Sequence, residues 1–179
     1  MLKISFYGVY YLTKILKFAF TMEKKCINIS YTEYASINEL NPSDKELLEN
    51  AIAATDTAYA PYSSFHVGAA VKLSNGEIVA GSNQENAAYP SGLCAERTTL
   101  FYAHAKYPDA AVETIALAAK QNGALTDRFT YPCGACRQVL HESQMRSGAP
   151  LRIIVGSATK VLVLDSVNDL LPFAFDNLI

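Results

Sequence analysis

Three cysteines in two short motifs could together hold one metal ion. Cys94 opens the motif Cys-Ala-Glu at 94–96, and Cys133 and Cys136 lie in Pro-Cys-Gly-Ala-Cys at 132–136. A zinc ion with three protein ligands keeps its fourth tetrahedral position open for water, as catalytic zinc sites do, whereas four protein ligands make a structural site. The pattern therefore favours an open zinc site with Cys94, Cys133 and Cys136 as its ligands.

Glu96 stands two residues after the first cysteine, where a carboxylate could move protons for a water molecule at that open position. A His or Cys ligand, a Glu two residues on and a later Pro-Cys-x-x-Cys are together the signature of zinc deaminases, in which the Glu is acid and base rather than ligand. The sequence therefore predicts Glu96 as the catalytic residue of the site.

Plainer interpretations exist for the same residues. The Cys133-x-x-Cys136 spacing alone also occurs in structural zinc knuckles and redox pairs. His104 or His141 could supply a fourth ligand and close the site, although this would leave the glutamate and the proline of the motifs without a role. Cys26 lies outside any ligand spacing and is expected to be a lone thiol.

Two predicted helices would carry the cysteines. Residues 95–106 have the apolar spacing of a helix with one buried face, and a second helix over 133–143 begins behind Pro132. A helix N-terminus carries partial positive charge and free N–H groups, and both favour thiolate over thiol. Helix N-termini are therefore expected to place the three ligands and to keep them ionised.

Two arginines are predicted to surround the metal ligands. Three thiolates around Zn²⁺ leave a net charge of −1, which would make a bound water less acidic than in a site with neutral ligands. Arg97 directly follows Glu96, and Arg137 directly follows Cys136. We expect at least Arg97 to donate hydrogen bonds to ligand sulfurs and so withdraw charge from the metal. The alternative for each is a surface arginine paired with an acid.

The remaining pattern predicts an α/β fold. Ser43 and Glu46 form a capping box for a helix that ends near Ala58, and residues 165–171 could form a short last helix. Residues 26–29 have weak strand character. Strands are predicted over residues 67–73, 78–83, 114–120, 152–156 and 161–164. The order αββαβαββ predicts a mixed five-stranded sheet sandwiched between helices.

The motifs resemble those of the cytidine deaminases, specifically the short-chain class with three cysteine ligands. The resemblance covers about residues 43 to 176, in the family's order and spacing. Its blocks are Tyr-Ala-Pro-Tyr-Ser-Ser-Phe-His-Val-Gly-Ala-Ala-Val at 59–71, Asn-Gln-Glu-Asn-Ala-Ala-Tyr at 83–89, Cys-Ala-Glu-Arg at 94–97, Pro-Cys-Gly-Ala-Cys-Arg-Gln at 132–138 and Leu-Leu-Pro-Phe-Ala-Phe at 170–175.

The resemblance implies substrate contacts within one chain. Phe65 would border the base, while Asn83 and Glu85 would form hydrogen bonds with the ribose hydroxyls. An amide and a carboxylate two apart on a strand do point to the same side. The alternatives are core packing for Phe65 and a polar turn at a strand end for Asn83 and Glu85.

The resemblance also implies a homotetramer with sites shared between subunits. Ala87, through its backbone, and Tyr89 would serve a neighbouring subunit's site, and Phe175 would reach across an interface to pack against the base. Phe173 departs from the family, which commonly has glycine there, and this extra ring could alter the pocket wall or the subunit contact.

The activity that the resemblance implies is hydrolysis of a C–N bond in a cyclic amidine. One zinc ion per subunit would serve the deamination of cytidine and deoxycytidine to uridine and deoxyuridine plus ammonia, in pyrimidine salvage. A deaminase of another aminopyrimidine or of an aminoacyl nucleoside antibiotic such as blasticidin would share the zinc chemistry. A non-catalytic zinc-stabilised binding module and a polynucleotide-editing enzyme are the alternatives from other classes.

Composition and charge limit the kinds of partner that the chain is expected to bind. The 179 residues, half of them hydrophobic, suffice for one domain with a core. Residues 1–25 hold five lysines and one glutamate, a net charge of +4, so the remainder carries −6 of the total of −2. An acidic domain is a poor binder of polyanions, so we expect an uncharged nucleoside rather than nucleic acid as its partner.

Residues 1–21 do not match the family. Their apolar run over 4–12 is too short to span a bilayer, and Lys14 and Lys17 follow it closely. A signal-peptide core without a clear cleavage site and a basic interfacial helix are alternatives. The leading expectation is an upstream start codon assigned in error, with a single domain from Met22 to Ile179. Metal-binding thiols without disulfides suit the cytoplasm.

Overall fold

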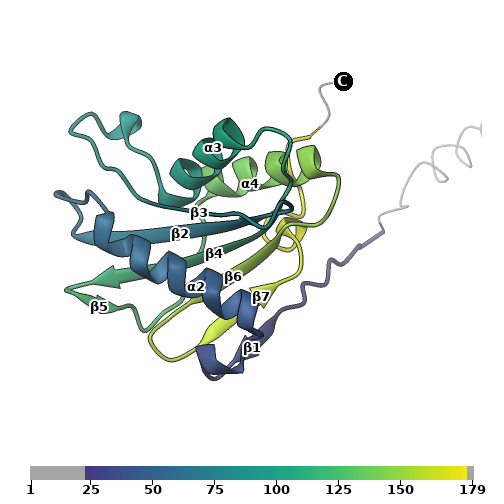
Figure 1. Cartoon of the computed structure of the whole chain (residues 1–179). Coiled ribbons are helices and arrows are strands. Elements are labelled where there is room, and N and C mark those ends of the chain that lie inside the picture. The colour runs from purple at the N-terminus through teal and green to yellow at the C-terminus, as the bar shows by residue number, and fades with distance from the viewer. Residues whose placement is uncertain (1–22, 177–179) are drawn as a thin grey trace, which may run out of the picture.

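A mixed β-sheet forms the centre of the computed structural model, which describes residues 23–176 (Figure 1). The predicted N-terminal extension, residues 1–21, lies outside the described residues. The strands follow the order β1-β7-β6-β4-β2-β3, and β5 pairs with β4. Their bounds are β1 Thr32–Tyr34, β2 Phe65–Leu73, β3 Ile78–Ser82, β4 Val112–Gln121, β5 Ala124–Leu125, β6 Arg152–Gly156 and β7 Val161–Leu164.

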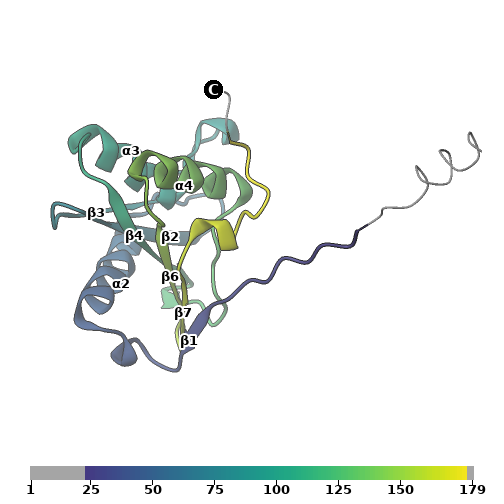
Figure 2. The same ribbon diagram turned by 90° about the vertical axis from the view of Figure 1, so that its right-hand side faces the viewer.

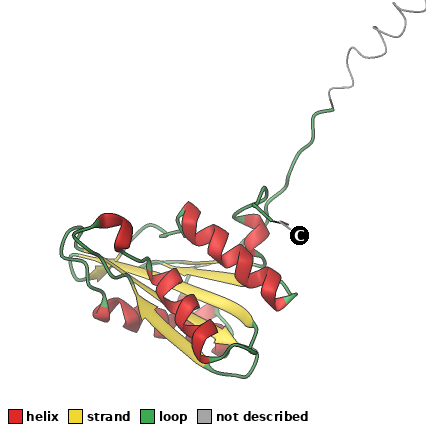
Figure 3. Ribbon diagram, turned by 90° about the horizontal axis from the view of Figure 1, so that it is seen from above, coloured by secondary structure: helices red, strands yellow, loops and turns green. Residues whose placement is uncertain are grey.

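Three helices cover the two faces of the sheet. Helix α2 (Pro42–Ala54) lies on one face, and α3 (Ala95–Lys106) and α4 (Gly134–Ser147) lie together on the other (Figures 1 and 2). Seen from above, α3 and α4 lie side by side over the strands (Figure 3). Each face has its own hydrophobic core, with Leu100 and Leu140 under α3 and α4. The α/β sandwich predicted from the sequence is therefore confirmed.

The strand directions explain why α3 and α4 begin close together. Strand β2 is antiparallel to both β3 and β4, so β3 and β4 run in the same direction. Helix α3 is the first α-helix after β3, and α4 is the first α-helix after β4, with the two-residue strand β5 between β4 and α4. Both helices therefore begin beyond the carboxyl edge of the sheet, which is where open α/β sheets bind their ligands. The topology brings the two cysteine motifs to this edge.

Helix α2 packs closely on the sheet because β2 has a glycine at the contact. A Cβ atom added at Gly68 would lie 2.0 Å from the Ala51 carbonyl oxygen and 2.7 Å from the Thr55 nitrogen, both backbone atoms of the helical side. Neither atom can move without shifting the chain of α2. The glycine in the 59–71 block thus sets the spacing between helix and sheet.

Several predicted elements match closely, and the differences have local causes. Helix 95–106 and strands 152–156 and 161–164 have the predicted bounds. Helix α2 begins earlier than predicted, because Asn41 rather than Ser43 is its N-cap: its side chain accepts from the Asp44 nitrogen, and Pro42 fills the first helical position.

The sheet has two short strands beyond the five that were predicted. Strand β1 pairs with β7, which follows it by more than a hundred residues, and β5 adds two residues beside β4. Residues 26–29 are not a strand, and the last predicted helix is the 3₁₀ turn η4 at Val167–Asp169. The other 3₁₀ turns are η1 Ile37–Glu39, η2 Thr55–Thr57 and η3 Tyr89–Ser91.

Within residues 23–176, no helix has the length and apolar character needed to cross a membrane.

Candidate metal centre

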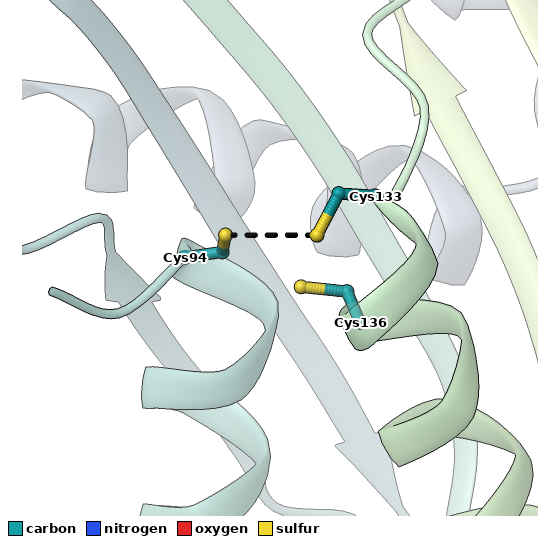
Figure 4. A group of neighbouring side chains, drawn as sticks. All are labelled: Cys94, Cys133 and Cys136. Carbon is teal, nitrogen blue, oxygen red and sulfur yellow. Dashed lines mark hydrogen bonds between the residues drawn. The ribbon is translucent and has the colours of Figure 1, made fainter. Parts of the chain in front are cut away.

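The three predicted ligand cysteines meet between the starts of α3 and α4 (Figure 4). The sulfurs of Cys94 and Cys133 are 3.9 Å apart, and all three sulfurs lie within 4.8 Å of one another. Tetrahedral Zn–S bonds of about 2.3 Å place two sulfurs about 3.8 Å apart. All four cysteines of the chain are free thiols. The three sulfurs therefore fit one zinc ion, and thiolates are ligands that zinc prefers.

Two helix N-termini point at this group. Cys94 is the N-cap of α3 and Cys133 the N-cap of α4, both with extended backbone and no side-chain capping bond. Cys136 lies in the first turn of α4 and is fully buried. The partial positive charge at the start of a helix stabilises an anion placed there. Two such ends thus offset part of the negative charge that three thiolates bring together.

The thiols are coupled by short contacts. Hydrogen bonds from the Cys136 thiol, from Arg97 and from the Cys133 thiol lower the pKa of Cys94 to about 5, against the opposing effect of burial. The contact with Cys94, together with burial, raises the pKa of Cys136. These contacts therefore favour the thiolate form of Cys94, and a bound cation would displace thiol protons, because a metal ion binds deprotonated sulfur.

The two arginines beside the motifs have different partners. Nη2 of Arg97 lies 3.8 Å from the Cys94 sulfur, the contact expected of a residue that withdraws charge from a ligand. Its Nε is buried and has no hydrogen-bond partner among residues 23–176. Arg137 differs from the expectation. It donates from Nε to the Pro132 carbonyl (2.9 Å) and from Nη1 to the Leu170 carbonyl (3.0 Å), and so braces the turn before Cys133.

Glu96 lies in the first turn of α3 and is 5% exposed. Burial, followed by the negative charge of Cys94, raises the pKa of the Glu96 carboxyl above its ordinary value. The rise moves the pKa of this carboxyl in the direction that favours proton transfer in catalysis.

The histidines that could have closed the site lie elsewhere. Nε2 of His104 pairs with the Ser143 hydroxyl at 3.0 Å, and Nε2 of His141 lies 3.9 Å from an Asp176 carboxylate oxygen. Among residues 23–176, only the three cysteines form a group that could hold a metal. The described part of the chain therefore offers three protein ligands and no fourth.

A cavity of about 490 Å³ opens beside the cysteines. Its wall includes Cys94, Arg97, Asn83, Glu85 and Tyr89. The structure thus brings five of the predicted site residues together around one hollow. A volume of this size suits a ligand of a few hundred daltons.

Asn83 joins the cavity wall to strand β2. Its Oδ1 accepts from the Val67 nitrogen at 2.8 Å, and its Nδ2 donates to the Phe65 carbonyl at 2.9 Å. These two bonds fix the amide where β3 ends. A side-chain amide has two donor hydrogens and two acceptor lone pairs, so one of each stays free for a ligand.

Glu85 is held ionised by the loop before β2. Its carboxylate accepts from the Ser63 hydroxyl, from the Tyr62 nitrogen at 2.9 Å and from the Ser63 nitrogen at 3.3 Å. These hydrogen bonds, the Ser63 hydroxyl first, lower the pKa of Glu85 below its ordinary value. The carboxylate thus fastens this loop to the cavity wall and keeps one acceptor site unused.

Three predicted contact residues lie outside the wall of this cavity, namely Phe65, Ala87 and Phe175. Phe65 begins β2 and is half-buried, Ala87 is exposed in the loop after Glu85, and Phe175 is 68% exposed near the C-terminus. Two wall residues, Tyr62 and Ser63, were assigned no role from the sequence. Their place in the 59–71 block was the signal that could have found them.

Comparison with known proteins agrees with this geometry. Residues 41–148 match the family described as "Cytidine and deoxycytidylate deaminase zinc-binding region". A cytidine deaminase of Halalkalibacterium halodurans is 40% identical over 129 residues, which cover 72% of this chain and 91% of the relative.

Solved structures give the same result. The cytidine deaminase of Burkholderia pseudomallei is 41% identical, with a TM-score of 0.58 over 73% of this chain and 97% of the other. The cytidine deaminase of Mycobacterium tuberculosis is 32% identical, with a TM-score of 0.60 over 76% of this chain and 100% of the other. The predicted resemblance is therefore confirmed.

We predict that Cys133→Ala abolishes zinc binding, because two remaining thiols cannot hold the ion against solvent. Cys133 is exposed, so the substitution should leave the fold intact, which far-UV circular dichroism checks. Elemental analysis after desalting should find no zinc in this variant and a full complement in Cys26→Ala, which removes a distant exposed thiol. Stoichiometric zinc in Cys133→Ala would disprove the ligand set.

We predict that Arg97→Gln weakens zinc binding by about 10- to 100-fold, as loss of a group that bonds to a metal ligand commonly does. Competition with a chromogenic chelator measures the affinity. Arg146→Gln removes an exposed arginine from the last turn of α4 and should bind zinc as the unaltered chain does. Equal affinities in the two variants would show that the contact of Arg97 with Cys94 has no effect on the metal.

Proposed function

Because the chain belongs to the cytidine and deoxycytidylate deaminase family, we propose that it hydrolyses cytidine and deoxycytidine to uridine and deoxyuridine plus ammonia. The observation that carries the proposal is the placement of the buried Glu96 beside three clustered thiols, one of which, Cys94, lies in the wall of a cavity that Asn83 and Glu85 also line. We assign Cys94, Cys133 and Cys136 as the ligands of one zinc ion per subunit.

Zinc held by the three thiols would lower the pKa of a bound water molecule, so that the water could lose a proton and act as a nucleophile at neutral pH. The protein's own part is proton transfer by Glu96. The carboxylate takes one proton from the water and passes it to N3 of the cytosine ring, which makes C4 electrophilic, and the water oxygen bonds to C4 as the N3=C4 double bond becomes single. Glu96 then takes the remaining proton of the new C4 hydroxyl and delivers it to the 4-amino group. The C4–N bond breaks, ammonia leaves, and the C4=O bond forms.

The surroundings of Glu96 support this double role. Burial raises the pKa of the Glu96 carboxyl, the direction that favours a group which must accept a proton and then release it. Arg97, bonded to the Cys94 sulfur, offsets charge on that ligand. Proton transfer by a positioned group contributes roughly 10²- to 10⁴-fold to a rate.

The polar residues of the cavity wall support a nucleoside as substrate. Asn83 keeps one free donor and one free acceptor, and the ionised Glu85 keeps an acceptor site, which together match the vicinal hydroxyls of ribose. The charged residues of the wall are Glu85 and Arg97, and Arg97 is already engaged at Cys94. A phosphate on the sugar would face Glu85 without a free cation, so an uncharged nucleoside is favoured.

We further propose that the enzyme acts as a homotetramer in cytoplasmic pyrimidine salvage. Tyr89 is 75% exposed although it lines the cavity, and Phe175 is 68% exposed. Large exposed aromatic side chains are typical of contact surfaces. Tyr89, Ala87 and Phe175 are therefore assigned to contacts between neighbouring subunits, and Phe65 to the border of the base.

We predict that Glu96→Gln loses at least about 10²-fold in kcat on cytidine while it keeps its zinc, since an amide of the same shape cannot transfer protons. The fall in absorbance as cytidine becomes uridine measures the rate. Glu142→Gln, which neutralises an exposed carboxylate on α4, should turn over normally. Near-normal turnover by Glu96→Gln would remove the assigned role.

A substrate panel tests the function itself. Ammonia release should follow addition of cytidine or deoxycytidine, and a zinc chelator should stop it. Deoxycytidine monophosphate should react with a kcat/KM at least about tenfold lower, because its phosphate meets Glu85. Preference for the monophosphate, or for blasticidin, would correct the substrate. Zinc-dependent folding without ammonia release from any of these compounds would indicate a binding module instead.

A further inference from the structure

The segment 170–176 is fastened to the first turns of α4, the helix that carries two of the cysteines (Figure 2). Arg137 donates to the Leu170 carbonyl at 3.0 Å and to the Pro132 carbonyl at 2.9 Å. One guanidinium group thus ties the start of the segment to the residue before Cys133. The start of the segment is therefore held in a fixed position relative to the turn that carries Cys133.

Gln138 holds the other end of the segment through a reciprocal pair of hydrogen bonds. Its Nε2 donates to the Phe175 carbonyl at 2.8 Å, and its Oε1 accepts from the Phe175 nitrogen at 3.4 Å. One side-chain amide thereby bonds both main-chain groups of a single residue, as a neighbouring strand would. This pairing fixes the direction of the Phe175 backbone, and with it the direction in which the ring leaves the chain.

The ring of Phe175 is exposed although its main chain is held. Its exposed fraction is 68%, and it does not belong to the wall of the cavity beside Cys94. Ordering a segment costs conformational entropy, so an arrangement that orders the main chain and leaves an aromatic ring in solvent calls for a contact outside the chain. Phe175 cannot border the nucleoside in its own chain's cavity in this arrangement.

The other polar contact of the segment is weaker. Nε2 of His141 lies 3.9 Å from an Asp176 carboxylate oxygen, and neither ring nitrogen of His141 has a hydrogen-bond partner among residues 23–176. Of the contacts that reach Phe175 itself, the pair from Gln138 is the one with hydrogen-bond geometry. Gln138 is therefore the residue on which the placement of the ring depends.

We propose that Gln138 is a positioning residue, which presents the ring of Phe175 to the nucleoside site of a second copy of this chain. The proposal rests on the proposed function, in which Phe175 packs against the base across a subunit interface. Gln138 lies two residues after Cys136, so the metal helix of one subunit would set the base-contacting ring of its neighbour's site. Gln138 acts through Phe175 and touches no reacting atom.

This role predicts a particular split of the kinetic constants. A ring that packs on the base stabilises bound substrate and transition state alike, so its loss raises KM and leaves kcat nearly unchanged. Gln138→Ala, which removes both hydrogen bonds, should raise KM for cytidine about tenfold. Gln138→Glu keeps the acceptor for the Phe175 nitrogen and loses the donor to the Phe175 carbonyl. Its KM for cytidine should therefore lie between those of the unaltered chain and of Gln138→Ala.

A double-mutant cycle separates this role from a general loss of stability. Phe175→Ala alone should raise KM at least as much as Gln138→Ala, and Gln138→Ala added to Phe175→Ala should change KM less than twofold. Zinc content and kcat should stay within about threefold in all variants. Glu142→Ala, an exposed position one turn further along α4, is the control and should match the unaltered chain.

Deuterium exchange gives a readout that does not depend on activity. The amides of residues 170–176 should exchange about tenfold faster in Gln138→Ala than in the control, while those of α3 keep their rate. Unchanged exchange, an unchanged KM in Gln138→Ala, or an undiminished effect of that substitution in the Phe175→Ala background would each overturn the proposal. Absence of cytidine deamination by the unaltered chain would instead overturn the proposed function.

Discussion

The charge on three neighbouring thiolates is the constraint on which the rest of the site depends. Three sulfurs within 4.8 Å of one another repel each other as anions, and the protein offsets this with two helix N-termini, with Arg97 and with the cation that the sulfurs fit. The strand order makes this possible, because β3 and β4 run in the same direction and deliver α3 and α4 to one edge. The order and direction of the strands thus determine that the three cysteines meet at one edge of the sheet.

The same anionic centre determines what its neighbours can do. Glu96 lies beside the thiolates in a buried position, and its carboxyl is held closer to its neutral form than a surface carboxyl would be. Glu85, in the wall of the cavity, is instead kept ionised by donors from the loop at 62–63. The surroundings of the two carboxyl groups thus shift their pKa values in opposite directions, which suits the roles proposed for them, Glu96 in proton transfer and Glu85 in recognition.

Much of this site could be predicted from the sequence, because its parts are local. The cysteine spacing, the starts of the two helices and the proximity of Arg97 to the Cys94 sulfur all depend on residues a few positions apart, which helix geometry relates directly. The carbonyl partners of Arg137 could not be predicted, since one of them, Leu170, is brought close only by the folded chain.

In the fold, too, elements with a clear local pattern could be predicted, and elements that depend on distant parts of the chain could not. The helix at 95–106 and the strands at 152–156 and 161–164 are clear in the sequence pattern. Strand β1 is too short to show a pattern of its own and exists through its pairing with β7. The sequence pattern also does not decide between two neighbouring candidates for a helix N-cap, as α2 shows by having Asn41 rather than Ser43 as its N-cap.

The central claim is that one zinc ion is held by three sulfurs and keeps its fourth position for water. X-ray absorption spectroscopy of the zinc-loaded protein measures the atoms around the metal directly. We expect three sulfur atoms at about 2.3 Å and a single oxygen at about 2.0 Å. A fourth sulfur, or the scattering pattern of an imidazole ring, would show that the zinc site is closed and has no position for water.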